Sequence, residues 1–146
     1  MKKVLVVYHS QGGNTEALAE AVGEGASSVP DIGSEVKAAA KTTAEDLISC
    51  DAVAFGTPDF FSYMAGMLKD FFDRIYYDAL HKVDEKPYAA FVSHGGGGKA
   101  IESVERICGS LQLKKAVEPL TVKGKPDADA LDKAKALGEA LAESIR

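Results

Sequence analysis

Cysteine and histidine are both scarce in this sequence of 146 residues. The two cysteines, Cys50 and Cys108, lack CxxC spacing and offer no disulfide framework, so we expect two small buried residues. The three histidines, His9, His81 and His94, lack the spacing of a metal site. The sequence therefore predicts neither a disulfide-stabilised fold nor a bound metal.

Long hydrophobic runs and an excess of positive charge are also missing. The apolar run at residues 4–8 is too short for the core of a signal peptide, and no run approaches the length of a membrane span. We therefore expect a cytoplasmic protein without membrane contact. The net charge of -5 argues against nucleic acid as a partner, because phosphate binding needs a basic face. A basic protein partner suits this charge better.

Strand and helix signals alternate along the whole chain. Strands are predicted at residues 3–8, 34–39, 52–55, 88–93 and 116–122. Helices are predicted at 14–26, from Thr43 onward, and at 64–77, 99–111 and 127–145. Five such repeats predict an α/β fold: a three-layer, doubly wound, five-stranded parallel sheet with helices on both faces. The length and the absence of repeats or linkers predict one domain, residues 1–146.

Ligands of such sheets bind beyond the carboxyl ends of the strands, so three loops matter most. The first, Ser10-Gln11-Gly12-Gly13-Asn14-Thr15, carries glycines, hydroxyls and an amide into a helix N-terminus. Unpaired backbone N–H groups and the helix dipole can hold a phosphate there without any lysine or arginine. The alternative is a turn in which Asn14 or Thr15 only caps the helix. The loop is neither a Walker A loop nor a GxGxxG fingerprint, so phosphoryl transfer is a poor interpretation.

The other two loops are aromatic and glycine-rich. Residues 57–66 hold three aromatic side chains and a methionine, which favours a flat aromatic ligand; the alternative is that they fold back onto the core. Residues 93–98 hold four glycines, which let backbone amides approach a ligand edge; the alternative is a flexible turn. As a lone ligand or base His94 is weak, and a role at the surface or in the turn explains it better. A single phosphate and a flat ring system together describe flavin mononucleotide (FMN).

These motifs resemble the flavodoxin family. Residues 10–15 match [Ser/Thr]-x-Thr-Gly-x-Thr except that Gly12 replaces the first threonine, which implies a weaker phosphate site. The middle loop, with Gly56-Thr57-Pro58, Phe61 and Met64-Ala65-Gly66-Met67, is similar to that of the Trp-repressor-binding-protein-like NAD(P)H:quinone oxidoreductases. The resemblance implies the flavodoxin strand order 2-1-3-4-5 and FMN as cofactor. Two family features are missing: a tyrosine in the loop after the fourth strand and a glycine within residues 57–63.

We therefore expect an FMN-binding electron-transfer protein, without assigned catalytic residues, that works with a reductase or an acceptor as a monomer or dimer. The expected phosphate ligands are Ser10, Gln11, Gly12, Gly13, Asn14 and Thr15. The expected ring neighbours are Thr57, Pro58, Asp59, Phe60, Phe61 and Ser62 on one side and Ser93, His94, Gly95, Gly96 and Gly97 on the other. Asp59, Asp70 and Asp73 are candidates for docking a basic partner, or simply a solvated helix face.

Three other functions compete with this expectation. An oxidoreductase that takes hydride from NAD(P)H and reduces quinones or flavins is the main alternative. A domain that serves only as an interaction partner stays open. A response-regulator-like module is excluded, because the places of its acidic residues hold Tyr8-His9-Ser10 and Phe55-Gly56-Thr57.

Overall fold

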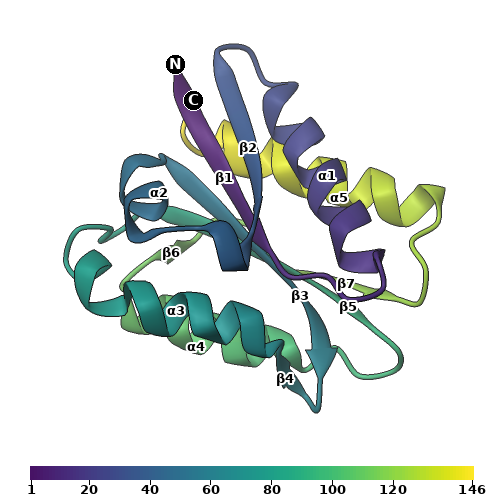
Figure 1. The fold of residues 1–146 in the computed structure, drawn as a ribbon. Helices are drawn as coiled ribbons and strands as arrows, with labels where there is room; N and C mark the ends of the chain where they lie inside the picture. Colours follow the sequence, from purple (N-terminus) through teal and green to yellow (C-terminus); the bar gives the residue numbers. More distant parts are fainter.

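The computed structural model describes residues 1–146 and shows the predicted alternation of strands and helices (Figure 1). The strands are β1 Lys2–Tyr8, β2 Ile32–Ala38, β3 Ala52–Phe60, β4 Tyr63–Met64, β5 Pro87–His94, β6 Lys114–Lys115 and β7 Leu120–Lys123. The helices are α1 Asn14–Ser27, α2 Ala44–Ser49, α3 Gly66–Ala79, α4 Ala100–Ser110 and α5 Ala128–Glu143, with a short 3-10 turn at Ala39–Lys41.

One parallel sheet organises these elements. Its order is β2-β1-β3-β5, and β6 and β7 both pair with the outer side of β5. The predicted order 2-1-3-4-5 is therefore confirmed, with the fifth position filled by two short strands. The predicted fifth strand at 116–122 is partly wrong. Pro119 lies between the two pieces, and a proline cannot donate a ladder hydrogen bond.

The third strand also differs from its prediction at 52–55. β3 continues to Phe60 and folds back in a hairpin, in which Asp59 and Phe60 pair antiparallel with Met64 and Tyr63. The helix predicted from Met64 consequently begins at Gly66. The sheet thus carries one antiparallel pair, located at the carboxyl end of β3.

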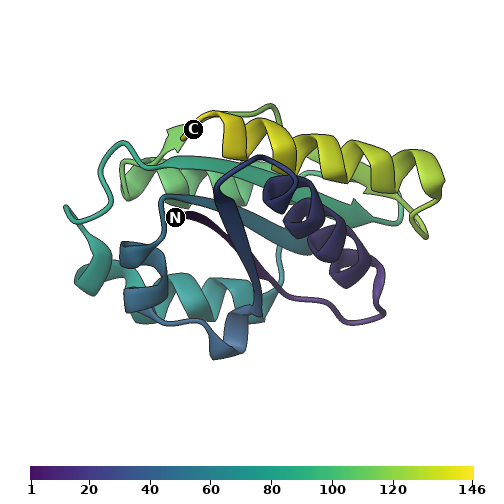
Figure 2. The same cartoon turned by 90° about the horizontal axis from the view of Figure 1, so that it is seen from above.

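Two apolar cores lie on opposite faces of the sheet (Figures 1 and 2). Alternate residues of β1 enter different cores: Val4 and Val6 pack towards α1 and α5, and Leu5 and Val7 pack towards α3 and α4. At the start of α2, the helix predicted from Thr43 onward, the Thr43 hydroxyl and the Asp46 carboxylate form a capping box. No helix is both long and apolar enough to cross a membrane.

Helices α1 and α5 approach each other closely because each presents a glycine at the crossing. A Cβ atom added at Gly138 would overlap the carbonyl oxygen of Val22, and one at Gly25 would overlap that of Lys135. In both views the two helices run side by side over the same face of the sheet (Figures 1 and 2). These glycines therefore set how deeply α5 covers the sheet.

We predict that Gly138→Ala lowers the free energy of unfolding by about 1–3 kcal/mol, because the added methyl group forces the helices apart. Urea unfolding measures the change. Gly109→Ala is the matched control, since a Cβ there meets nothing within 4 Å. The control should leave stability unchanged or raise it by up to about 1 kcal/mol, as alanine favours helix. Equal losses in both variants would contradict the close approach.

Candidate functional site

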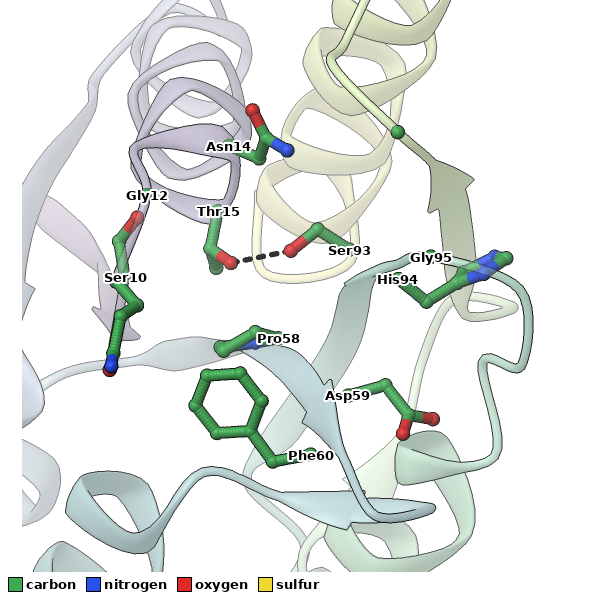
Figure 3. A pocket seen from close by; sticks show the side chains of 12 residues that line it. Ser10, Gly12, Asn14, Thr15, Pro58, Asp59, Phe60, Ser93, His94 and Gly95 are labelled. Atoms are coloured by element: carbon green, nitrogen blue, oxygen red, sulfur yellow. Dashed lines mark hydrogen bonds between the residues drawn. The ribbon is translucent and has the colours of Figure 1, made fainter.

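A hollow lies at the carboxyl ends of β1, β3 and β5, where the three predicted loops meet (Figure 3). Its lining comes from residues far apart in the sequence: Ser10, Gln11, Gly12, Asn14, Thr15, Pro58, Asp59, Phe60, Ser93, His94, Gly95 and Gly124. All of these except Gly124 were expected from the sequence. No lysine or arginine is among them.

The first loop leaves backbone donors free at the start of α1. Gly13 precedes the helix with a φ of 101°, and its N–H donates to the Ser10 hydroxyl at 3.1 Å. The N–H groups of Asn14, Thr15 and Glu16 have no hydrogen-bond partner within the protein. Together with the helix dipole they form an anion site of the predicted kind. The Ser10 hydroxyl keeps its own hydrogen free to donate.

A buried pair of hydroxyl groups joins the first loop to β5. The oxygens of Thr15 and Ser93 lie 2.6 Å apart, and the two residues are 1% and 5% exposed (Figure 3). One hydroxyl donates to the other, so only one of the two hydrogens is left for a ligand in the hollow. The pair therefore fixes the positions of the two hydroxyl oxygens at the hollow.

The hairpin between β3 and β4 forms the opposite wall. Phe60 lies beside Pro58 and lines the hollow (Figure 3). Phe61 and Ser62 make the two-residue turn, with φ values of 59° and 63°. Turns of this kind favour asparagine and glycine, and left-handed backbone costs other residues roughly 1–2 kcal/mol each. The Phe61 side chain is fully exposed and gains no packing in return.

The Asp59 carboxylate holds this turn in place. One oxygen accepts from the Ser62 N–H at 2.9 Å, and the other accepts from the Ala100 N–H at 3.0 Å. Ala100 is the first residue of α4, and only Lys99 separates it from the glycine loop. One side chain thus ties the aromatic loop to the glycine loop, so both walls of the hollow form one unit.

Six predicted site residues lie outside the hollow: Gly13, Thr57, Phe61, Ser62, Gly96 and Gly97. Thr57 is fully buried, and its hydroxyl accepts from the Ala65 N–H at 2.8 Å and donates to the Pro58 carbonyl. Gly13 shapes the turn into α1, and Phe61 and Ser62 shape the hairpin. Their contribution to the hollow is to position its lining.

Gly124 is the lining residue that the sequence interpretation missed. Its N–H donates to the His94 carbonyl at 2.8 Å, which brings the end of β7 against β5. The signal was present, because Gly124 also follows a strand of the parallel sheet and precedes a capped helix. The His94 side chain points away from Thr15 and Ser93, and its buried Nδ1 has no partner (Figure 3).

Titratable side chains with shifted pKa values lie outside the lining of the hollow and add little chemistry to it. Tyr8 ends β1, and its hydroxyl donates to Glu16 at 2.9 Å. Desolvation and this hydrogen bond to Glu16 raise the pKa of Tyr8. Burial raises the pKa of the Cys50 thiol to about 11 and that of Cys108 well above its usual value, so both remain protonated at neutral pH. The two cysteines are buried as expected.

Comparison with known proteins gives consistent matches. Residues 2–123 match the family described as NADPH-dependent FMN reductase. A flavodoxin from Aquifex aeolicus is 38% identical over 98 residues, 67% of this chain and 53% of that protein. An NAD(P)H dehydrogenase (quinone) from Acidithiobacillus ferrooxidans is 35% identical over 94 residues, 51% of this chain and 47% of that protein. The solved structure of a flavodoxin from the domain Archaea is 29% identical, with a TM-score of 0.89 over 98% of both chains.

These matches confirm the predicted fold and the resemblance to flavodoxins. The chain spans about half the length of the two curated relatives, 53% and 47%. The two relatives also differ in their names, one a flavodoxin and the other a quinone dehydrogenase.

We predict that Asp59→Ala loosens the hairpin and α4 together. Loss of two hydrogen bonds to a carboxylate should lower the free energy of unfolding by about 1–3 kcal/mol. Amide hydrogen exchange should speed up at Ser62 and Ala100 in particular. Asp78→Ala is the control, because Asp78 is exposed and makes no side-chain bond in the structure. Unchanged exchange at both amides in Asp59→Ala would contradict this role.

Proposed function

The chain belongs to the NADPH-dependent FMN reductase family, and we propose that within this family it is an electron-transfer protein of the flavodoxin type. FMN, the predicted flavin, is confirmed as the flavin of this family. When bound, FMN supplies the redox chemistry, and the protein supplies binding and orientation. The observation that carries the proposal is the convergence of three loops on one hollow whose lining holds free amides and hydroxyls.

The residues of the first loop fit the phosphate of FMN. The free N–H groups of Asn14, Thr15 and Glu16 point out of the start of α1, and the Ser10 hydroxyl can add a further donor. Anions bind such sites without a cationic side chain. Gly12 offers no hydroxyl where the flavodoxin motif has a threonine. The buried bond between Thr15 and Ser93 gives the remaining threonine a fixed orientation.

The hairpin and the glycine loop fit the ring system. Phe60 and Pro58 present flat apolar surface at one wall, and Gly95 lets the backbone come close at the other. The only carboxylate in the lining, Asp59, has both oxygens bonded to backbone N–H groups. No carboxylate in the lining is therefore free to exchange a proton with the ring, which suits an electron carrier.

The second candidate is an NAD(P)H-dependent oxidoreductase that reduces quinones or flavins. The family description and the quinone dehydrogenase from Acidithiobacillus ferrooxidans favour it. An enzyme of this kind would consume NAD(P)H steadily without a reductase partner. The expected single domain, the cytoplasmic location and the monomeric or dimeric state stay predictions.

Visible absorption of the purified protein tests the proposal first. We expect flavin bands in the protein as isolated or after addition of FMN. In an anaerobic titration with dithionite, a long-wavelength absorption band should then appear when the flavin is half reduced, as expected for a carrier that takes one electron at a time. NADPH alone should be consumed slowly. Fast consumption together with direct bleaching would favour the oxidoreductase, and a colourless protein that ignores FMN would overturn both.

We also predict that Ser93→Ala weakens FMN binding through the phosphate. With its partner removed, the Thr15 hydroxyl loses its fixed orientation. The Kd for FMN should rise about tenfold, which corresponds to roughly 1.4 kcal/mol, while the Kd for riboflavin stays the same. Fluorescence quenching of both flavins measures the ratio.

Ser103→Ala serves as the matched control. Ser103 is also buried, but its hydroxyl bonds to Met64 and Ala100, away from the first loop. This variant should lose stability and leave the ratio of the two Kd values unchanged. Equal weakening of FMN and riboflavin in Ser93→Ala would mean that Ser93 acts on the ring or on folding.

A further inference from the structure

Three exposed lysines adjoin, along the chain, the glycine loop and the lining residue Gly124. Lys99 follows the glycine loop and precedes α4, and Lys123 and Lys125 flank the lining residue Gly124. We propose that these three residues, the basic rim, dock an acidic redox protein against the flavin site. This proposal rests on the proposed function, which supplies the electron transfer, and it adds that the partner is an acidic protein.

The backbone brings the basic rim together although its members are far apart in the sequence. Lys123 pairs with His94 in the register of β5 and β7, so both side chains leave the same face of the sheet. His94 and the Thr121 methyl group lie next to Gly98, the residue before Lys99. The end of β7 therefore lies against the turn that leads into α4.

The basic rim has no internal partner for its charge. None of the eight ion pairs involves Lys99, Lys123 or Lys125, and no hydrogen bond uses their ammonium groups. Asp127, just beyond Lys125, accepts from the Ala130 N–H as the cap of α5. The unpaired carboxylate closest along the chain is that of Glu102, three residues after Lys99. The rim thus presents net positive charge on a chain whose total is -5.

The acidic residues expected to dock a basic partner are already engaged. Asp73 pairs with Lys69 at 2.6 Å, and Asp70 pairs with Arg74 at 2.8 Å. Asp59 is bonded to backbone N–H groups at the wall of the hollow. The two ion pairs partly neutralise Asp70 and Asp73, whereas Asp59 keeps its charge and directs both oxygens to backbone N–H groups.

An apolar contact point lies next to the basic rim. The Phe61 side chain is fully exposed at the tip of the hairpin, and Asp59 ties that hairpin to Ala100, the neighbour of Lys99. An exposed aromatic ring among unpaired charges matches the composition of protein interfaces, with an apolar centre and a polar rim. Opposite charges on a partner would steer it so that its redox centre meets the flavin edge.

Electron transfer with two carriers of opposite charge tests the proposal. The probes are reduced acidic plant-type [2Fe–2S] ferredoxin, which gives one electron per encounter to the oxidised flavin, and basic cytochrome c, which takes one from the reduced flavin. Stopped-flow rates are measured with the FMN-loaded protein over a range of salt concentrations. We expect the ferredoxin rate to fall as salt rises, and the cytochrome rate to stay level or increase.

Charge-reversal variants distinguish an effect of the basic rim from an effect of the net charge of the protein. The double variant Lys99→Glu/Lys123→Glu should slow the ferredoxin reaction at low salt at least about tenfold. Lys82→Glu/Lys114→Glu is the matched control, because both lysines are exposed and unpaired and the change in charge is identical. Lys114 pairs with Pro87 at the opposite end of β5, away from the hollow. Equal slowing in both double variants would overturn the proposal.

A titration followed by NMR tests docking independently of flavin chemistry. Ferredoxin added to the ¹⁵N-labelled chain, with or without FMN, should shift the amides of residues 95–99 and 123–125 in a salt-dependent way. A colourless protein that still shows these shifts would end the proposed function and leave the docking surface intact. Shifts elsewhere, no shifts, or equal shifts with a single-stranded oligonucleotide would contradict an acidic protein as the partner.

Discussion

The parallel pairing of β1 with both β2 and β3 is the constraint on which the rest of the structure depends. A strand buried between two parallel neighbours forces the chain to return over a face of the sheet each time, and helices make those returns. Apolar side chains then fill both faces, which gives the two cores. The same constraint places the carboxyl ends of β1, β3 and β5 at one edge, so their loops meet there, and the contacts of Asp59 and Thr15 then hold the loops together.

Much of this architecture was predictable, because buried parallel strands appear in the sequence as uninterrupted apolar runs. The run at residues 4–8 has no polar interruption, and the glycines and hydroxyls after it can only lie at the sheet's ligand edge. The extension of β3 to Phe60 was not predictable, since its hairpin turns through Phe61 and Ser62, which are poor turn residues. The turn exists because Asp59 bonds to Ser62 and to Ala100, a contact across 41 residues.

The site shows the same division between local and distant causes. Ser10, Asn14 and Thr15 were predictable from one short segment, because a helix N-terminus carries free N–H groups wherever it forms. The bond between Thr15 and Ser93 joins residues 78 apart and depends on β5 lying next to β3. Gly124 lines the hollow because its N–H bonds to the His94 carbonyl. The strand β7 begins later than predicted because Pro119 interrupts the edge of the sheet.

The net charge of the chain says less about the surface near the site than any other sequence observation. The total of -5 suggested a basic partner, but the total says nothing about which carboxylates are already bonded. Asp70 and Asp73 pair along α3, and Asp59 and Asp127 serve backbone N–H groups at helix starts. The ion pairs partly cancel the charges of Asp70 and Asp73, whereas Asp59 and Asp127 remain charged but are held by helix starts. Lys99, Lys123 and Lys125 have no ion-pair partner, so a protein with an acidic total carries unpaired positive charge next to the loops at which its flavin would be reached.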